Sequence, residues 1–295
     1  MDLGLFIELA MTGALVGAMY GLVALGIVLI YKTSGTANFA QGAIAMMGGY
    51  LTWLFAAGLE LPMWLAIPAA VAAMFCFGIL VERTVLRRMI GQPVIMVVML
   101  TFGIELLLRG AVPGLLGSAV KRLSLGIPQA PVFLGEVLIN RAYLIGGGIS
   151  AALIVAAIVL FNSRAGIIMR AVSDDQGASW SVGIRVERAI AIAWGLSAVA
   201  ATFAGILWGS MQGIDWSLSL LLMKALAIAI LGGLDSIPGV LLAAVIVGVC
   251  ESLATGFLDP IVGGGTRDIV ASVIIVVTLM VRPYGLFGHE QIERV

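Results

Sequence analysis

Long apolar runs recur along this chain, and they constrain its fold more than any other feature. A helix needs about 20 mostly apolar residues to cross the hydrocarbon core of a bilayer. The composition agrees, because 61% of the residues are hydrophobic and 11% are charged, against roughly 45–50% and 25% in soluble domains. We therefore predict a single all-α domain over residues 1–295, a polytopic transmembrane helical bundle. Eight spans are predicted, at Leu5–Ile30, Ala40–Gly58, Pro62–Val81, Pro93–Leu108, Tyr143–Phe161, Ile190–Gly209, Ile237–Leu253 and Ile269–Val281.

A ninth apolar segment, Leu220–Leu234, is short, contains Lys224 and ends in two glycines. It is either a full span or a broken, re-entrant one. Nine spans with the N-terminus outside and the C-terminus in the cytoplasm agree with the preference of Lys and Arg for cytoplasmic loops. The inner loops then hold Lys32, Arg83, Arg87, Arg88, Arg164, Arg170, Arg185, Arg188, Arg282 and Arg294, and the outer side holds Arg109, Lys121, Arg122, Arg141 and Arg267. We therefore predict nine spans, and keep about eight to nine as the range.

Three ionisable residues fall at membrane depth, where a charge is costly and a functional role is the first hypothesis. Glu105 lies four residues before Arg109, the spacing of a helical ion pair, so it is either neutralised there or functional. Lys224 and Glu251 lie on adjacent segments near their predicted outer ends, where they could meet. Whether they do meet is left open by the sequence.

Two polar turns interrupt the apolar pattern. The first contains Asn38 and Gln41 and precedes a helix rich in small residues, which favours tight packing but also permits a pathway role. The second contains Asp235 and Ser236, either of which can cap the helix that follows, with Pro238 in its first turn. Glycines at every fourth position, Gly13, Gly17 and Gly21, predict a helix face that a neighbour approaches closely.

The longest predicted inner segment, 162–188, is rich in charge around a short helical stretch near Ala171–Val182. It is either a docking element for a cytoplasmic partner or an ordinary charged loop. Catalytic motifs are lacking: the sequence has no Walker A loop, HExxH, nucleophile elbow or Cys/His metal set. We therefore expect no enzyme and no cofactor, and the zero net charge gives no sign of nucleic-acid binding.

The chain resembles the permeases of high-affinity branched-chain amino acid ABC importers, of the LivH type, along essentially its whole length. The resemblance rests on the order of the Asn38–Gly42, Arg164–Gly166, Arg170–Ala171, Gly232–Gly239, Glu251–Leu253 and Arg282–Gly288 motifs, together with Asp175, Ala178, Gly183 and Lys224. It implies a bacterial inner-membrane protein that hydrolyses no ATP itself. The implied partners are a second related permease, two cytoplasmic ATPases and a periplasmic or surface substrate-binding protein.

The resemblance also implies roles for individual residues. Contact with an ATPase is expected of Arg164, Gly166, Arg170, Asp175, Ala178 and Gly183. The candidates for the translocation pathway are Asn38, Gln41, Glu105, Lys224, Asp235, Ser236 and Glu251. Ala43, Asp235 and Trp180 depart from the family pattern, so importers of urea, short amides or aromatic acids stay open as alternatives. An ion-coupled secondary transporter is a further alternative, because broken helices and charges at membrane depth also suit that class.

Overall fold

The computed structural model describes residues 3–89, 92–126, 131–134 and 137–288, which leaves Arg294 outside the described residues. The chain folds as an all-α bundle, as predicted. The long helices are α1 (Leu3–Ser34), α3 (Met63–Thr84), α4 (Val94–Leu116), α5 (Arg141–Phe161), α8 (Val186–Gln212) and α10 (Ile237–Phe257). The shorter helices are α2 (Gln41–Trp53), α6 (Arg164–Asp174), α7 (Gln176–Ser181), α9 (Leu221–Gly232), α11 (Asp259–Val262) and α12 (Thr266–Val281), with the single turns η1 (Leu54–Gly58), η2 (Leu86–Met89) and η3 (Trp216–Leu220).

Six helices of the described chain are long and apolar enough to cross a membrane, namely α1, α3, α4, α5, α8 and α10. The three remaining predicted spans correspond to shorter elements. Helix α2 continues into the π-helical turn η1, and α12 has 16 residues. The ambiguous ninth segment becomes α9, which has 12 residues and is preceded by the 3-10 turn η3.

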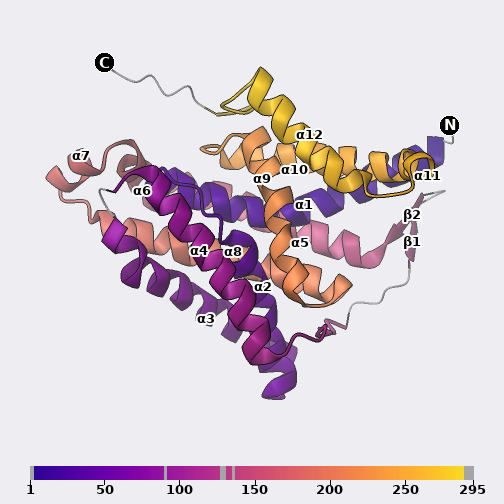
Figure 1. Cartoon of the computed structure of the whole chain (residues 1–295), viewed down its shortest axis with the longest axis horizontal. Coiled ribbons are helices and arrows are strands. Elements are labelled where there is room, and N and C mark those ends of the chain that lie inside the picture. The colour runs from indigo at the N-terminus through magenta and orange to yellow at the C-terminus, as the bar shows by residue number, and fades with distance from the viewer. Residues whose placement is uncertain (1–2, 90–91, 127–130, 135–136, 289–295) are drawn as a thin grey trace.

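Helix α1 is the centre of the bundle, and Figure 1 shows it running through the middle of the molecule between the α9, α10 and α12 side and the α3 and α8 side. From Gly17 to Ile30 nearly every residue of α1 is buried. The predicted glycine face is confirmed, because α1 and α10 approach each other through it. A Cβ on Gly13 would lie 2.5 Å from the Gly248 carbonyl oxygen, and one on Gly17 would clash with the Ala244 carbonyl. Small residues therefore set this helix spacing.

Helix α2 packs into the opposite side of the core, against α8. A Cβ on Gly48 would lie 2.7 Å from Thr202, and Gly49 faces Gly205. Tight packing of this small-residue helix is therefore confirmed. The helices α3, α4 and α12 present large apolar side chains at the surface, among them Trp64, Leu107 and Met280. Such faces suit lipid rather than water.

The segment 162–188 differs from its predicted helical stretch near Ala171–Val182. It contains two helices, α6 and α7, which meet at Asp175. Asp175 has an extended backbone, and its carboxylate accepts a hydrogen bond from Ala178 N at 2.9 Å. Asp175 thus ends α6 and caps α7, since a side-chain oxygen at this position satisfies a free helical N–H.

A short antiparallel hairpin between α4 and α5 was not predicted. Strand β1 (Pro131–Leu134) pairs with β2 (Val137–Asn140), with Val132 opposite Ile139. Asn140 then caps α5 by accepting a hydrogen bond from Ala142 N at 2.9 Å. The hairpin is the only two-stranded element among the described residues.

Candidate functional site

The first polar turn forms a neutral, buried network, which we call the Gln41 cluster (Asn38, Gln41 and Ser197). Asn38 donates to Gln41 Oε1 at 3.0 Å, and Ser197 Oγ lies 2.9 Å from the same oxygen. Gln41 donates to the Ser197 carbonyl at 3.1 Å, and Ser197 Oγ donates to the Gly26 carbonyl at 2.9 Å. All three side chains have zero exposure. The network joins the start of α2 to the middle of α1 and to α8.

Lys224 and Glu251, whose meeting the sequence left open, are in contact. Lys224 Nζ lies 2.8 Å from Glu251 Oε1 and 2.8 Å from Asp268 Oδ1, and it donates to the Arg267 carbonyl at 2.9 Å. We call these four residues the Lys224 cluster. Glu251 is 2% exposed, whereas the Asp268 side chain is 87% exposed. The lysine thus joins α9 to α10 inside the protein and to α12 at its surface.

The Glu105–Arg109 ion pair is also confirmed. Arg109 NH1 lies 3.4 Å from Glu105 Oε1 within α4, and the carboxylate is nearly buried while the guanidinium is half-exposed. The guanidinium carbon is also 5.4 Å from the centre of the Trp216 ring. Glu105 is therefore neutralised on its own helix, which supports the anchoring interpretation of this residue.

The second polar turn lies between α9 and α10. Ser236 caps α10, as predicted, because its Oγ accepts from Gly239 N at 3.1 Å. Lys32, at the end of α1, donates to the Asp235 carbonyl. The segment that follows α12 docks on the same turn, where Leu286 N donates to the Leu231 carbonyl at 2.8 Å. Three distant parts of the sequence therefore meet here.

The α6–α7 segment combines anchored and exposed side chains. Met169 and Val172 are buried against the bundle, and Ser179 Oγ donates to the Ala171 carbonyl at 2.9 Å, which ties α7 to α6. Among the predicted contact residues, Arg164, Asp175, Ala178 and Gly183 are exposed, Arg170 is half-buried, and Gly166 packs on the Phe161 backbone. Large apolar side chains are exposed beside them: Ile167, Ile168, Trp180 and Val182.

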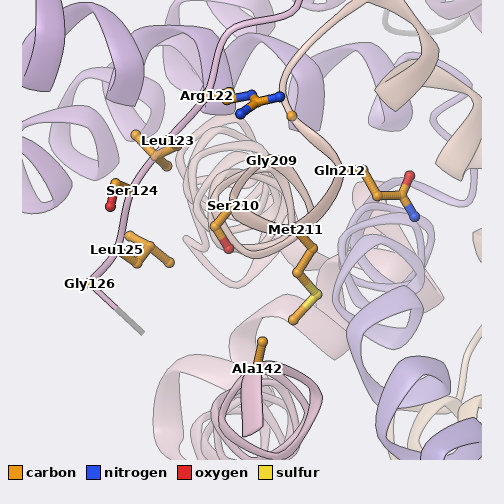
Figure 2. Close-up of a pocket in the computed structure, with 11 residues that line it drawn as sticks. Arg122, Leu123, Ser124, Leu125, Gly126, Ala142, Gly209, Ser210, Met211 and Gln212 are labelled. Atoms are coloured by element: carbon orange, nitrogen blue, oxygen red, sulfur yellow. The ribbon is translucent and has the colours of Figure 1, made fainter. Parts of the chain in front are cut away.

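A cavity of about 330 Å³ lies where α8 ends (Figure 2). Its wall is made by the chain segment Arg122–Gly126, the α8 end at Gly209–Gly213, and Ala142 at the start of α5. Figure 2 shows Arg122 above Ser210 and Ala142 below it, on different elements. None of the predicted site residues lines this cavity.

Residues 9–281 match the family model described as the permease component of the branched-chain amino acid transport system. The chain belongs to this family. The permease protein LivH of Salmonella typhimurium is 27% identical over 98% of both chains, and the permease protein BraD of Pseudomonas aeruginosa is 29% identical over 98% of both. A probable LivH of Methanocaldococcus jannaschii is 29% identical over 91% of this chain and 88% of its own.

A solved structure of PsaBC from Streptococcus pneumoniae in complex with Fab shares the fold of this permease. Its TM-score is 0.50 at 12% identity, and the match covers 97% of this chain and 95% of that chain. Such a low identity supports a common fold and nothing more specific. The match therefore shows that the all-α architecture of this chain also occurs in a solved structure.

The structure places the permease's predicted pathway residues in separate groups. Asn38 meets Gln41, Lys224 meets Glu251, and Glu105 pairs within α4. Sequence reasoning missed Asp268 and the contact of Lys32 with the α9–α10 turn. An acidic residue in the first turn of a helix, as Asp268 is in α12, was the available signal for the first. The second depends on distant packing, which has no local signal.

Proposed function

We propose that this chain is the membrane-spanning permease subunit of an ATP-binding-cassette importer for branched-chain amino acids. The observation that carries the proposal is the family match over residues 9–281. Relatives named as branched-chain amino acid permeases also match this chain over nearly their whole length. A second related permease would complete the pathway, two cytoplasmic ATPases would supply energy, and a substrate-binding protein would deliver the amino acid. The chain itself would carry out no catalysis.

The α6–α7 segment is the proposed contact with an ATPase. With nine spans, this contact requires the N-terminus outside and the C-terminus in the cytoplasm. Buried Met169 and Val172 hold the segment to the bundle, so a force applied to it would reach α1, α5 and α8. Trp180 is 52% exposed and Val182 is 74% exposed. Exposed aromatic side chains of this kind are typical anchors in protein interfaces.

A pair of substitutions tests this contact. Trp180→Ala should weaken co-purification of the ATPases and lower uptake at least tenfold, whereas Trp64→Ala, on a more exposed tryptophan of α3, should leave both unchanged. Charge reversal at Arg170 adds a second test. Asp175→Asn should preserve the cap of α7, whereas Asp175→Lys should remove it. If Asp175 has a coupling role, both variants lose uptake, but only the lysine variant loses the α7 helix. Unchanged ATPase binding and uptake in all these variants would end the coupling proposal.

The residues proposed to flank the pathway are Asn38, Gln41, Glu105, Lys224, Asp235, Ser236 and Glu251. Within the chain Asn38 and Gln41 are fully buried, so substrate reaches them only if helices move during transport. Cysteine substitutions at these positions, labelled in ATP-bound and ATP-free complexes, test the assignment. Labelling that depends on the nucleotide state supports it, and labelling that is absent in both states removes the residue from the pathway.

Purification of the tagged chain from its native membrane tests the function as a whole. We expect two ATPases, a second permease, and ATPase activity that rises when a binding protein loaded with leucine, isoleucine or valine is added. Stimulation by urea, an amide or an aromatic acid instead would keep the importer and replace its substrate. Uptake by the chain alone, driven by a proton or sodium gradient without ATP, would overturn the proposal.

A further inference from the structure

A small cavity lies beside the Lys224 cluster, between α1, α5, α8, α10 and the start of α12. Its volume is about 50 Å³. The lining residues come from five helices: Thr12, Gly13, Val16, Tyr143, Trp208, Gly248, Glu251, Ser252 and Arg267. Gly13 and Gly248 are also the residues of the close α1–α10 contact, so the cavity sits directly beside that crossing.

Three buried polar atoms on two of these lining residues have no hydrogen-bond partner among the described residues. They are the indole Nε1 of Trp208 and both carboxylate oxygens of Glu251. Trp208 is 1% exposed and Glu251 is 2% exposed. Lys224 Nζ lies 2.8 Å from Glu251 Oε1 as an ion pair, and Oε2 has no such contact among the described residues.

The Trp208 ring is fixed in place, so its N–H cannot turn to find another acceptor. It stacks on Tyr20 with ring centres 4.7 Å apart and an angle of 16° between the planes. A buried donor or acceptor without a partner costs roughly 1–3 kcal/mol. The Trp208 N–H and Glu251 Oε2 are therefore the buried groups of the cavity lining that still require a partner.

We propose that this cavity is an internal water-binding site in which ordered water accepts from Trp208 Nε1–H and donates to the Glu251 carboxylate. The chemistry selects water among small ligands. A bare cation would satisfy Glu251 but not an N–H donor, and an anion would satisfy Trp208 but be repelled by Glu251. The volume exceeds the roughly 10–15 Å³ that one water needs, and it is far below the roughly 300 Å³ at which ligand pockets begin.

The water gives Glu251 its second set of contacts. Lys224 approaches the carboxylate from α9, and the water reaches it from the side of Trp208 and α8. A buried ion pair is stable only when the remaining lone pairs are also satisfied. The bound water therefore positions the Glu251 carboxylate between α9 and α8. It also stabilises this charge on α10, beside the close contact of α10 with α1.

A high-resolution cryo-electron microscopy structure of the full chain in lipid nanodiscs tests the site directly. We expect a density peak within roughly 2.7–3.2 Å of both Trp208 Nε1 and a Glu251 oxygen, the range of ordinary hydrogen bonds. A peak that contacts Glu251 but not Trp208, and that changes height between sodium and potassium buffers, would replace water with a cation. A cavity without density, in a map that shows other buried waters, would overturn the proposal.

Ultraviolet resonance Raman spectroscopy gives an independent measurement in solution. The difference between the wild type and Trp208→Phe isolates this indole, and the phenylalanine ring retains the stack on Tyr20. We expect the indole bands of a hydrogen-bonded N–H, and their deuterium shift on transfer to D2O. Trp64→Phe, on an exposed tryptophan, is the matched control for the subtraction. Bands of a free, non-exchanging N–H at Trp208 would contradict the water site.

Discussion

The Gln41 cluster and the Lys224 cluster are both buried and polar, but they are built from different chemistry. The Gln41 cluster carries no formal charge, and its members bond to one another and to backbone carbonyls. The Lys224 cluster has four formal charges that cancel, and its buried carboxylate lacks hydrogen bonds from the described residues. The first is complete within the chain, whereas the second needs solvent on one side.

The difference indicates what each cluster can do. A fully bonded neutral network has one favoured arrangement and specifies a unique packing of α1, α2 and α8. An ion pair that reaches the surface at Asp268 can change its partners when neighbouring helices shift. We therefore expect the Lys224 cluster to be the more sensitive of the two to substitution.

The largest effect is expected from Glu251→Leu, which leaves the Lys224 ammonium without its buried counter-charge. Removing one member of a buried pair costs about 3–5 kcal/mol, and the retained contact with Asp268 places this variant toward the lower end. Unfolding of the purified chain in mixed micelles measures the change. The double variant Lys224→Met with Glu251→Leu should recover part of the loss, because no buried charge is then left unpaired and Asp268 is exposed to solvent. A single variant as stable as the wild type would break the comparison.

A smaller effect is expected from Gln41→Leu. The substitution leaves the Asn38 amide and the Ser197 carbonyl without the Gln41 partner, and unsatisfied buried polar groups cost about 1–3 kcal/mol. The same unfolding measurement applies, with Gln212→Leu at the exposed end of α8 as the control that should stay within about 0.5 kcal/mol of the wild type. If Gln41→Leu cost more than Glu251→Leu, the assigned order of the two clusters would be reversed.

Asp268→Asn sharpens the comparison inside the Lys224 cluster. Asp268 and Glu251 lie at the same 2.8 Å from Lys224, but the Asp268 side chain is 87% exposed. Solvent screens an exposed pair, whose contribution is typically below about 1 kcal/mol. We expect a loss in that range, reduced further at high salt. A loss equal to that of Glu251→Leu would show that burial does not separate the two carboxylates.

Features that depend on local sequence patterns could be predicted from the sequence. The apolar runs predicted the six helices that are long enough to cross a membrane. The spacing of Gly13 and Gly17 predicted the face of α1 that meets α10. Both predictions depend on local sequence periodicity. The Ser236 cap and the Glu105–Arg109 pair were likewise predicted from near neighbours. Lys224 and Glu251 were identified as exceptional because charge is costly at membrane depth.

Other features depended on packing between distant segments and could not be predicted. Asp268 and Trp208 reach the neighbourhood of Glu251 from α12 and α8, and no pattern in the sequence relates these positions. The break at Asp175 had a local signal, since aspartate is a strong N-cap, but the same residue is also tolerated inside a charged helix. The lengths of α2, α9 and α12 depend on where the surrounding bundle ends each helix.

The smallest effect is expected at Asp259, which lies outside both clusters. Hydrogen bonds from the Thr266 hydroxyl and backbone N–H hold the pKa of the Asp259 carboxyl below its usual value. Because the folded pKa is the lower one, the stabilisation is present at neutral pH and is lost as the pH falls through the folded pKa. The free energy of unfolding of the wild type should therefore be slightly larger than that of Asp259→Asn at neutral pH, and the difference should vanish in acid. Thr266→Val, which removes the hydroxyl but keeps the N–H, should reproduce part of the effect, and a difference that grows in acid would contradict this assignment.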